Sequence, residues 1–176
     1  MTTRAHDPRR LDVAAAAATD AELAGRWPLS ELARLADGAV GEVDEPVAWS
    51  ARFEQRREPG AATQVWLHLQ ARARVARECQ RCLQPVLLAL DVDRAFRFAL
   101  TEDEAAALDA DSEDDVLVLA RQFDLHELVE DELLLALPIV PKHEQCPAPL
   151  SGQAAEELTP EHPFAALASL KRGSGP

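Results

Sequence analysis

The sequence predicts an α+β protein in which helices flank an antiparallel β-meander sheet that could close in part. Three long stretches alternate apolar and polar side chains, as strands with one buried face do. Two other stretches have helical spacing and begin at capping residues. The chain has 176 residues, of which 47% are hydrophobic. This length and composition suit one domain with a core of ordinary size.

The first predicted helix covers Ser30–Asp37, with Ser30 as its N-cap and Gly38 just beyond its end. Two alternating strands follow at residues 47–54 and 65–75, joined by turn-like residues 58–61. A third strand covers residues 85–100, and its apolar face is interrupted only by Arg94. The Cys-Gln-Arg-Cys sequence at residues 79–82 lies between two of these strands, so we expect it at the tip of an antiparallel hairpin.

The second half of the chain begins with a helix over residues 102–108 and a short strand over 116–119. The strongest helical pattern is at residues 124–137, where Asp124 and Glu127 have the spacing of a capping box and Pro138 ends the helix. Residues 162–172 form a short amphipathic segment. We therefore expect a flexible N-terminus over residues 1–10, one domain over 11–150, and a partly flexible tail with a short helix over 151–176.

Charge is unevenly distributed along the chain. The net charge is −13, yet residues 1–100 carry 14 basic and 14 acidic side chains, while residues 101–176 carry 4 and 17. An acidic protein binds nucleic acid poorly unless its cations are gathered on one surface. Three interpretations stay open: a basic patch that faces RNA, an acidic surface that binds a basic ribosomal or assembly protein, or charge that serves solubility alone.

The candidate RNA-binding residues are the arginines of the second strand and of the hairpin tip. Arg72 and Arg74 fall on the wet face of the strand, about 7 Å apart, and Arg77 and Arg81 come next along the chain. The candidate partner-binding residues are acidic side chains on the outer face of the helix at 124–137. They are Glu127, Glu130 and Asp131.

The longest apolar stretch, Leu133–Pro141, is far shorter than the ~18 residues of a membrane-spanning helix. The N-terminal residues mix arginine with aspartate and lack the apolar region of a secretory signal. We therefore expect a cytoplasmic protein with no membrane partner.

The cysteines give the sharpest chemical signal. Cys79 and Cys82 form a CxxC pair, and His143 and Cys146 form an HxxC pair in a proline-rich segment. Together they would provide the Cys₃His set of a structural zinc site. A redox pair is less favoured, because strands rather than a helix N-terminus flank the CxxC. In a third interpretation Cys79 and Cys82 only cap the hairpin and Cys146 is incidental.

The sequence has no GxxxxGK, GxGxxG, HExxH or GxSxG motif, and no pair of carboxylates is singled out for acid–base chemistry. We therefore expect no catalytic residues and no enzyme.

Three stretches resemble, in order and spacing, the bacterial YceD family of large ribosomal RNA subunit accumulation proteins. They are CQRCLQP at Cys79–Pro85, LVEDELLLALPIVPKH at Leu128–His143 and HPFAALASLKR at His162–Arg172. The resemblance extends from about Leu11 to Arg172. It implies a role in the synthesis, processing or stability of large-subunit ribosomal RNA, without an established catalytic activity.

These observations predict a noncatalytic ribosome-biogenesis factor that binds ribosomal RNA, a pre-ribosomal particle, or a basic ribosomal or assembly protein. Two alternatives remain open. A zinc-dependent RNA-processing enzyme would keep one metal position open to substrate, and an acidic adaptor would bind only basic ribosomal proteins.

Overall fold

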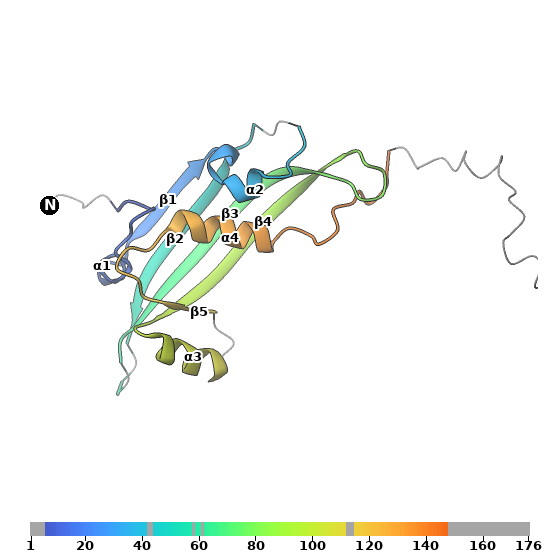
Figure 1. Cartoon of the computed structure of the whole chain (residues 1–176). Helices are drawn as coiled ribbons and strands as arrows, with labels where there is room; N and C mark the ends of the chain where they lie inside the picture. Colours follow the sequence, from blue (N-terminus) through green and yellow to red (C-terminus); the bar gives the residue numbers. More distant parts are fainter. Residues whose placement is uncertain (1–5, 42–43, 58, 61, 112–114, 148–176) are drawn as a thin grey trace, which may run out of the picture.

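A computed structural model describes residues 6–41, 44–57, 59–60, 62–111 and 115–147. Its centre is a five-stranded sheet whose strands lie side by side in chain order. The strands are β1 (Glu22–Trp27), β2 (Val47–Arg56), β3 (Gln64–Glu78), β4 (Pro85–Ala99) and β5 (Asp115–Val118). The first four form an antiparallel meander, and β5 pairs with β4 in parallel. The predicted α+β class is confirmed, with a sheet that is open rather than partly closed (Figure 1).

The helices are α1 (Val13–Ala18), the 3₁₀ turn η1 (Leu29–Glu31), α2 (Ala33–Ala36), α3 (Glu102–Asp111) and α4 (Leu125–Leu135). Three of the helices, α1, α2 and α4, cover one face of this sheet, and α3 lies at its end (Figure 1). Buried residues of α1, α2 and α4 share one core with the apolar face of β2, β3 and β4. Phe53, Leu67 and Leu133 in this core are fully buried. The α3 helix instead contacts β5 and the end of β4.

The alternating pattern gave the three long strands to within a few residues, and the predicted hairpin tip is confirmed between β3 and β4. The predicted helix at Ser30–Asp37 is divided into η1 and α2, because Leu32 leaves the helical region at φ −94° and ψ 80°. Ser30, the predicted N-cap, lies inside η1, whose N-cap is Pro28. The α1 helix and β1 were not predicted.

The parallel pairing of β5 departs from the all-antiparallel sheet that the sequence predicted. The α3 helix carries the chain back from the end of β4, so the next strand runs in the same direction as β4. Arg94 interrupts the apolar face of β4 because it lies at the rim of the core. There its guanidinium group contacts the carboxylates of Asp115, at 2.5 Å, and Glu132, at 3.8 Å.

The position of α4 determines where the chain leaves toward the hairpin tip. The helix begins at Asp124, whose carboxylate accepts a hydrogen bond from Glu127 N at 3.0 Å. His126 is buried, and its ring packs edge-on against Trp27, with 4.6 Å between ring centroids. Near the middle of α4, the buried Glu130 carboxylate accepts hydrogen bonds from α2. These contacts hold α4 on the sheet, so the segment that follows it starts from a fixed point.

Part of the predicted N-terminal tail contacts this body. Leu125 N donates to Pro8 O at 2.8 Å, and the Arg9 guanidinium group pairs with Glu31 at 3.1 Å. The predicted C-terminal tail at 151–176, with its helix at 162–172, lies outside the described residues. None of the helices in the described part of the chain combines the length and apolar character of a bilayer-spanning helix.

Candidate metal centre

The turn between β3 and β4 holds the first pair of candidate ligands. Cys79 N donates to Gln84 O at 2.9 Å, and Leu83 N donates to Cys79 O at 2.8 Å. Leu83 has a positive φ of 60°, an uncommon conformation for a side chain that is not glycine. This tight turn brings the buried side chains of Cys79 and Cys82 to one side of the hairpin tip, where they form a small cluster with Val86.

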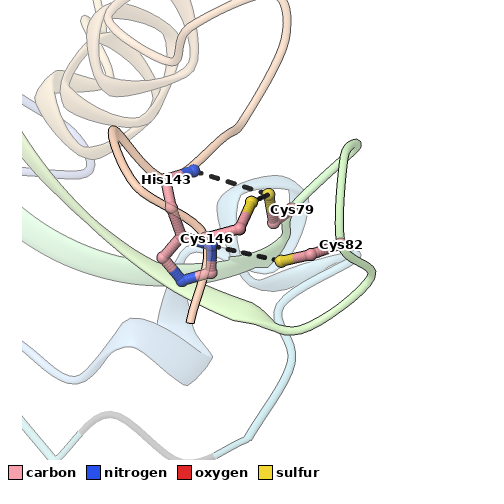
Figure 2. Close-up of side chains that lie close together, drawn as sticks. All are labelled: Cys79, Cys82, His143 and Cys146. Atoms are coloured by element: carbon pink, nitrogen blue, oxygen red, sulfur yellow. Dashed lines mark hydrogen bonds between the residues drawn. The ribbon is translucent and has the colours of Figure 1, made fainter. Parts of the chain in front are cut away.

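The second pair of ligands comes from the segment after α4. Prolines keep this segment out of regular structure, and its backbone runs beside the hairpin tip, where Gln80 N donates to Pro141 O at 2.9 Å. His143 and Cys146 follow and face the two cysteines of the turn (Figure 2). The hairpin and the segment after α4 therefore meet at one cluster. Its two pairs of candidate ligands are about sixty residues apart in the sequence.

The geometry of the cluster fits a tetrahedral metal ion. One ligand atom from each of Cys79, Cys82, His143 and Cys146 can be chosen so that all four lie within 4.8 Å of one another. The Cys79 and Cys146 sulfur atoms are 3.9 Å apart, and Cys82 Sγ is 3.4 Å from His143 Nδ1. Zinc–sulfur bonds of about 2.3 Å in a tetrahedron place two sulfur atoms about 3.8 Å apart. The structure thus brings together all four predicted ligands, and the Cys79–Cys146 distance is close to the sulfur–sulfur distance of a zinc tetrahedron.

The orientation of the His143 ring supports the same conclusion. Its Nε2 lies 3.0 Å from the carbonyl oxygen of Pro85, which can only accept a hydrogen bond. This contact favours the tautomer with the proton on Nε2, so the lone pair of Nδ1 faces the sulfur atoms. Metal-ligating histidines are commonly held in this way, with the second ring nitrogen donating to a carbonyl or carboxylate oxygen.

The two cysteines of the turn have different electrostatic surroundings. Burial by itself raises the pKa of Cys79, but N–H groups of His143 and of the turn donate to its sulfur and lower the pKa to about 5. His143 N is one of these donors, at 3.4 Å. Burial raises the pKa of Cys82. Of these two thiols, Cys82 is therefore the one from which metal binding would have to displace a proton.

The four arginines predicted to bind RNA are not brought together as one patch. Arg72 and Arg74 lie on the open face of the sheet, and each pairs with a carboxylate, Asp91 at 3.0 Å and Glu45 at 3.6 Å. The other two have different surroundings. Arg77 donates to Leu35 O at 2.7 Å, and Arg81 donates to Cys146 Sγ at 3.0 Å.

The three acidic residues predicted to bind a partner are divided as well. Glu127 is exposed, whereas Glu130 is buried, and its carboxylate accepts hydrogen bonds from Arg34 and Leu35. Asp131 is half-buried and pairs with Arg34 at 2.6 Å. Of the three, Glu127 and in part Asp131 present a carboxylate to solvent, whereas the helical pattern had predicted this for all three.

Sequence analysis found all four candidate ligands but not the groups that hold them. It did not identify the Pro85 carbonyl as a partner of His143, and it placed Arg81 among RNA-binding residues. Arg81 lies between Cys79 and Cys82 in the sequence, so its position was the one available signal for a role at the cluster. Pro85 is part of the hairpin, and only the fold shows that its carbonyl faces His143.

Comparison with known proteins gives one family. Residues 67–171 match the model of the family described as "Large ribosomal RNA subunit accumulation protein YceD". A protein of that name from Haemophilus influenzae is 37% identical over 102 residues, which are 54% of this chain and 59% of that protein. The match therefore spans somewhat more than half the length of this relative. No solved structure matches the chain.

Proposed function

The chain belongs to the YceD family of large ribosomal RNA subunit accumulation proteins, and from this premise we propose that it supports the accumulation of large-subunit ribosomal RNA without catalysing a reaction. The family match over residues 67–171 is the observation that carries the proposal. This match includes the hairpin, α4 and all four candidate metal ligands. It therefore covers the part of the chain in which the candidate site lies.

A noncatalytic role is supported by the chemistry of the candidate metal centre. Zinc enzymes leave one metal position for water or substrate, whereas structural zinc sites fill four positions with protein ligands. Here three thiolates and one imidazole would complete the tetrahedron. A zinc ion in this cluster would fasten the segment after α4 to the hairpin tip. It would have no position left at which to activate a water molecule for RNA cleavage.

The charges favour a basic protein over bare RNA as the direct partner. The net charge is −13. Arg72 and Arg74 already face carboxylates. Contact with RNA phosphates would compete with these ion pairs and would bring a polyanion to an acidic protein. Exposed acidic side chains are available for a basic partner, namely Glu102 and Asp103 on α3 and Glu127 on α4. We propose that the chain binds a basic ribosomal or assembly protein in the precursor of the large subunit.

Neutralising variants separate the two kinds of contact. The triple variant Glu102→Gln, Asp103→Asn, Glu127→Gln should lower affinity for purified large-subunit precursor particles about fivefold, or roughly 1 kcal/mol, because surface charges contribute modestly to association. The double variant Arg72→Ala, Arg74→Ala should change it less than about twofold. Affinity is measured by fluorescence anisotropy of the labelled chain at two salt concentrations, and the binding of protein-free ribosomal RNA is measured in parallel.

The reverse pattern contradicts a protein partner. Tight binding of protein-free ribosomal RNA, with a steep salt dependence that the arginine variant reduces, would show that RNA is contacted directly. Cleavage of precursor RNA by the zinc-loaded chain, lost on chelation, would contradict the noncatalytic role. In cells of the source organism, deletion of the gene should lower large-subunit relative to small-subunit ribosomal RNA. An unchanged ratio would contradict the proposed function itself.

A further inference from the structure

We infer that Arg81 is the positioning residue of the metal centre, in that it fastens the two pairs of ligands to each other and offsets the negative charge of their thiolates. The inference rests on the proposed metal site and assigns to Arg81 a role other than the RNA contact expected from its sequence position. Arg81 lies on the hairpin turn between Cys79 and Cys82, and its side chain donates hydrogen bonds to the segment after α4.

The guanidinium group of Arg81 makes contacts along two sides. Its Nε donates to Cys146 Sγ at 3.0 Å. Its Nη2 donates to His143 O at 3.0 Å and to Glu144 O at 3.3 Å. A planar guanidinium group can hold such a fork of acceptors in one fixed geometry, which a lysine ammonium group cannot reproduce. Arg81 therefore connects the turn that carries one pair of ligands to the backbone that carries the other pair.

The charge of the metal-bound cluster gives Arg81 a second effect. A zinc ion carries two positive charges and three cysteine thiolates carry three negative charges, so the neutral histidine leaves one negative charge in excess. In an acidic chain, the guanidinium group beside Cys146 supplies the opposite charge at hydrogen-bond distance. Removing a group outside the ligand set that orients the ligands in this way commonly lowers metal affinity by roughly 10- to 100-fold.

The same contacts remove Arg81 from the predicted RNA-binding set. With Nε on Cys146 and Nη2 on two backbone carbonyl groups, three of its five N–H donors are engaged at the cluster. An RNA phosphate would have to compete with a thiolate and two carbonyls for this side chain. The loss of Arg81 should therefore affect metal binding and leave RNA or particle binding of the zinc-loaded chain unchanged.

The test compares zinc affinity in the full-length chain and three variants. The variants are Arg81→Gln, which removes the charge, Arg81→Lys, which keeps the charge but not the fork, and Arg26→Gln on β1 as a matched control away from the cluster. Affinity is measured by competition with a chelator of known zinc affinity. Absorption of the cobalt-substituted chain then reports whether the metal is tetrahedral and bound to thiolates. Circular dichroism of the metal-free forms checks that each variant is folded.

We expect Arg81→Gln to lower zinc affinity about 10- to 100-fold, Arg81→Lys to recover part of this loss, and Arg26→Gln to resemble the wild type. At saturating cobalt, all four chains should show the same tetrahedral thiolate spectrum, because Arg81 is not itself a ligand. Wild-type affinity in Arg81→Gln would overturn the inference while leaving the metal site intact. A wild-type chain that binds neither zinc nor cobalt would overturn the metal site. If metal-free Arg81→Gln loses its fold as well as its zinc affinity, Arg81 has a general structural role instead, and the inference is overturned.

Discussion

Replacing Cys79 with serine is expected to remove tight zinc binding and to release the segment after α4 from the hairpin tip. A serine hydroxyl stays protonated at neutral pH, so it does not replace the thiolate that Cys79 supplies. Bound zinc should fall from about one equivalent to near zero, because the variant keeps only three of the four ligands that a structural zinc site needs. Structural zinc contributes about 10 kcal/mol or more to folding in isolated zinc-finger peptides. The loss here should therefore be large but local.

The loss should be local because the cluster of candidate ligands and the main core share no buried residue. Cys79, Cys82 and Val86 form their own small buried group, with Cys146 packed against it. The large core lies between the helices and the middle of the sheet. Hydrogen exchange should show faster exchange over residues 138–147 and at the hairpin tip in the Cys79→Ser variant. Protection around Phe53 at the centre of β2 should stay unchanged.

A control from the same turn makes this result specific. Gln80 is exposed and adjacent to Cys79, so Gln80→Ser introduces the same side chain without touching the ligand set. This variant should bind zinc like the wild type. Equal zinc content in Cys79→Ser and wild type would contradict the metal site. It would also be contradicted if a chelator left the hydrogen exchange of residues 138–147 in the wild type unchanged.

Sequence alone predicted the central strands because each has one buried and one wet face. The period-two pattern of β2 and β3 follows directly from that difference in surroundings. The short strand predicted at residues 116–119 is present as β5, but the sequence could not show that it pairs with β4 in parallel, because the α3 connection decides that direction. Sequence analysis missed β1, in which Gly25 takes the place of a larger apolar side chain. A Cβ at that position would lie 2.9 Å from the Trp49 ring.

The four candidate ligands were predictable because cysteine and histidine at short spacing are typical of metal sites. The surroundings of the arginines were harder to predict, because their partners come from distant segments. Arg74 pairs with Glu45, and Arg77 reaches the carbonyl of Leu35. The sequence pattern alone could have shown that Arg77 lies on a different face of the strand from Arg72 and Arg74. Side chains two apart along a strand share a face, so Arg77 falls on the face of Val75 rather than on that of Arg74.

Replacing Glu130 with alanine is expected to lower the free energy of unfolding by about 2–3 kcal/mol, the second large effect that the structure predicts. The Glu130 carboxylate accepts hydrogen bonds from Arg34 N at 2.7 Å, Leu35 N at 3.2 Å and Arg34 Nε at 3.0 Å. Its side chain is 8% exposed. Alanine would leave two backbone N–H groups of α2 without their acceptor in a partly buried place, and α4 would lose its polar attachment to α2. Urea unfolding of both chains measures the difference.

The same carboxylate gives the stability a defined pH dependence. Burial raises the pKa of Glu130. The N–H groups of Leu35 and Arg34 and the charge of Arg34 lower it by more than burial raises it, so the pKa in the folded chain is below the usual value. A lowered pKa in the folded state means that the ionised carboxylate stabilises the fold above its unfolded pKa of about 4.3, and that this stability is lost as pH falls through the folded pKa. The stability difference between wild type and Glu130→Gln should therefore be constant near neutral pH and shrink below about pH 4.

Glu127→Gln is the matched control, because Glu127 lies one turn earlier on α4 with its side chain exposed. This variant should unfold within about 0.5 kcal/mol of the wild type, as substitutions at exposed positions usually do. The attachment of α2 to α4 also sets the point from which the chain runs to His143, so Glu130→Ala should weaken zinc binding modestly while Glu127→Gln leaves it unchanged. Equal unfolding free energies for Glu130→Ala and Glu127→Gln would show that α4 is held on the sheet by its apolar face alone.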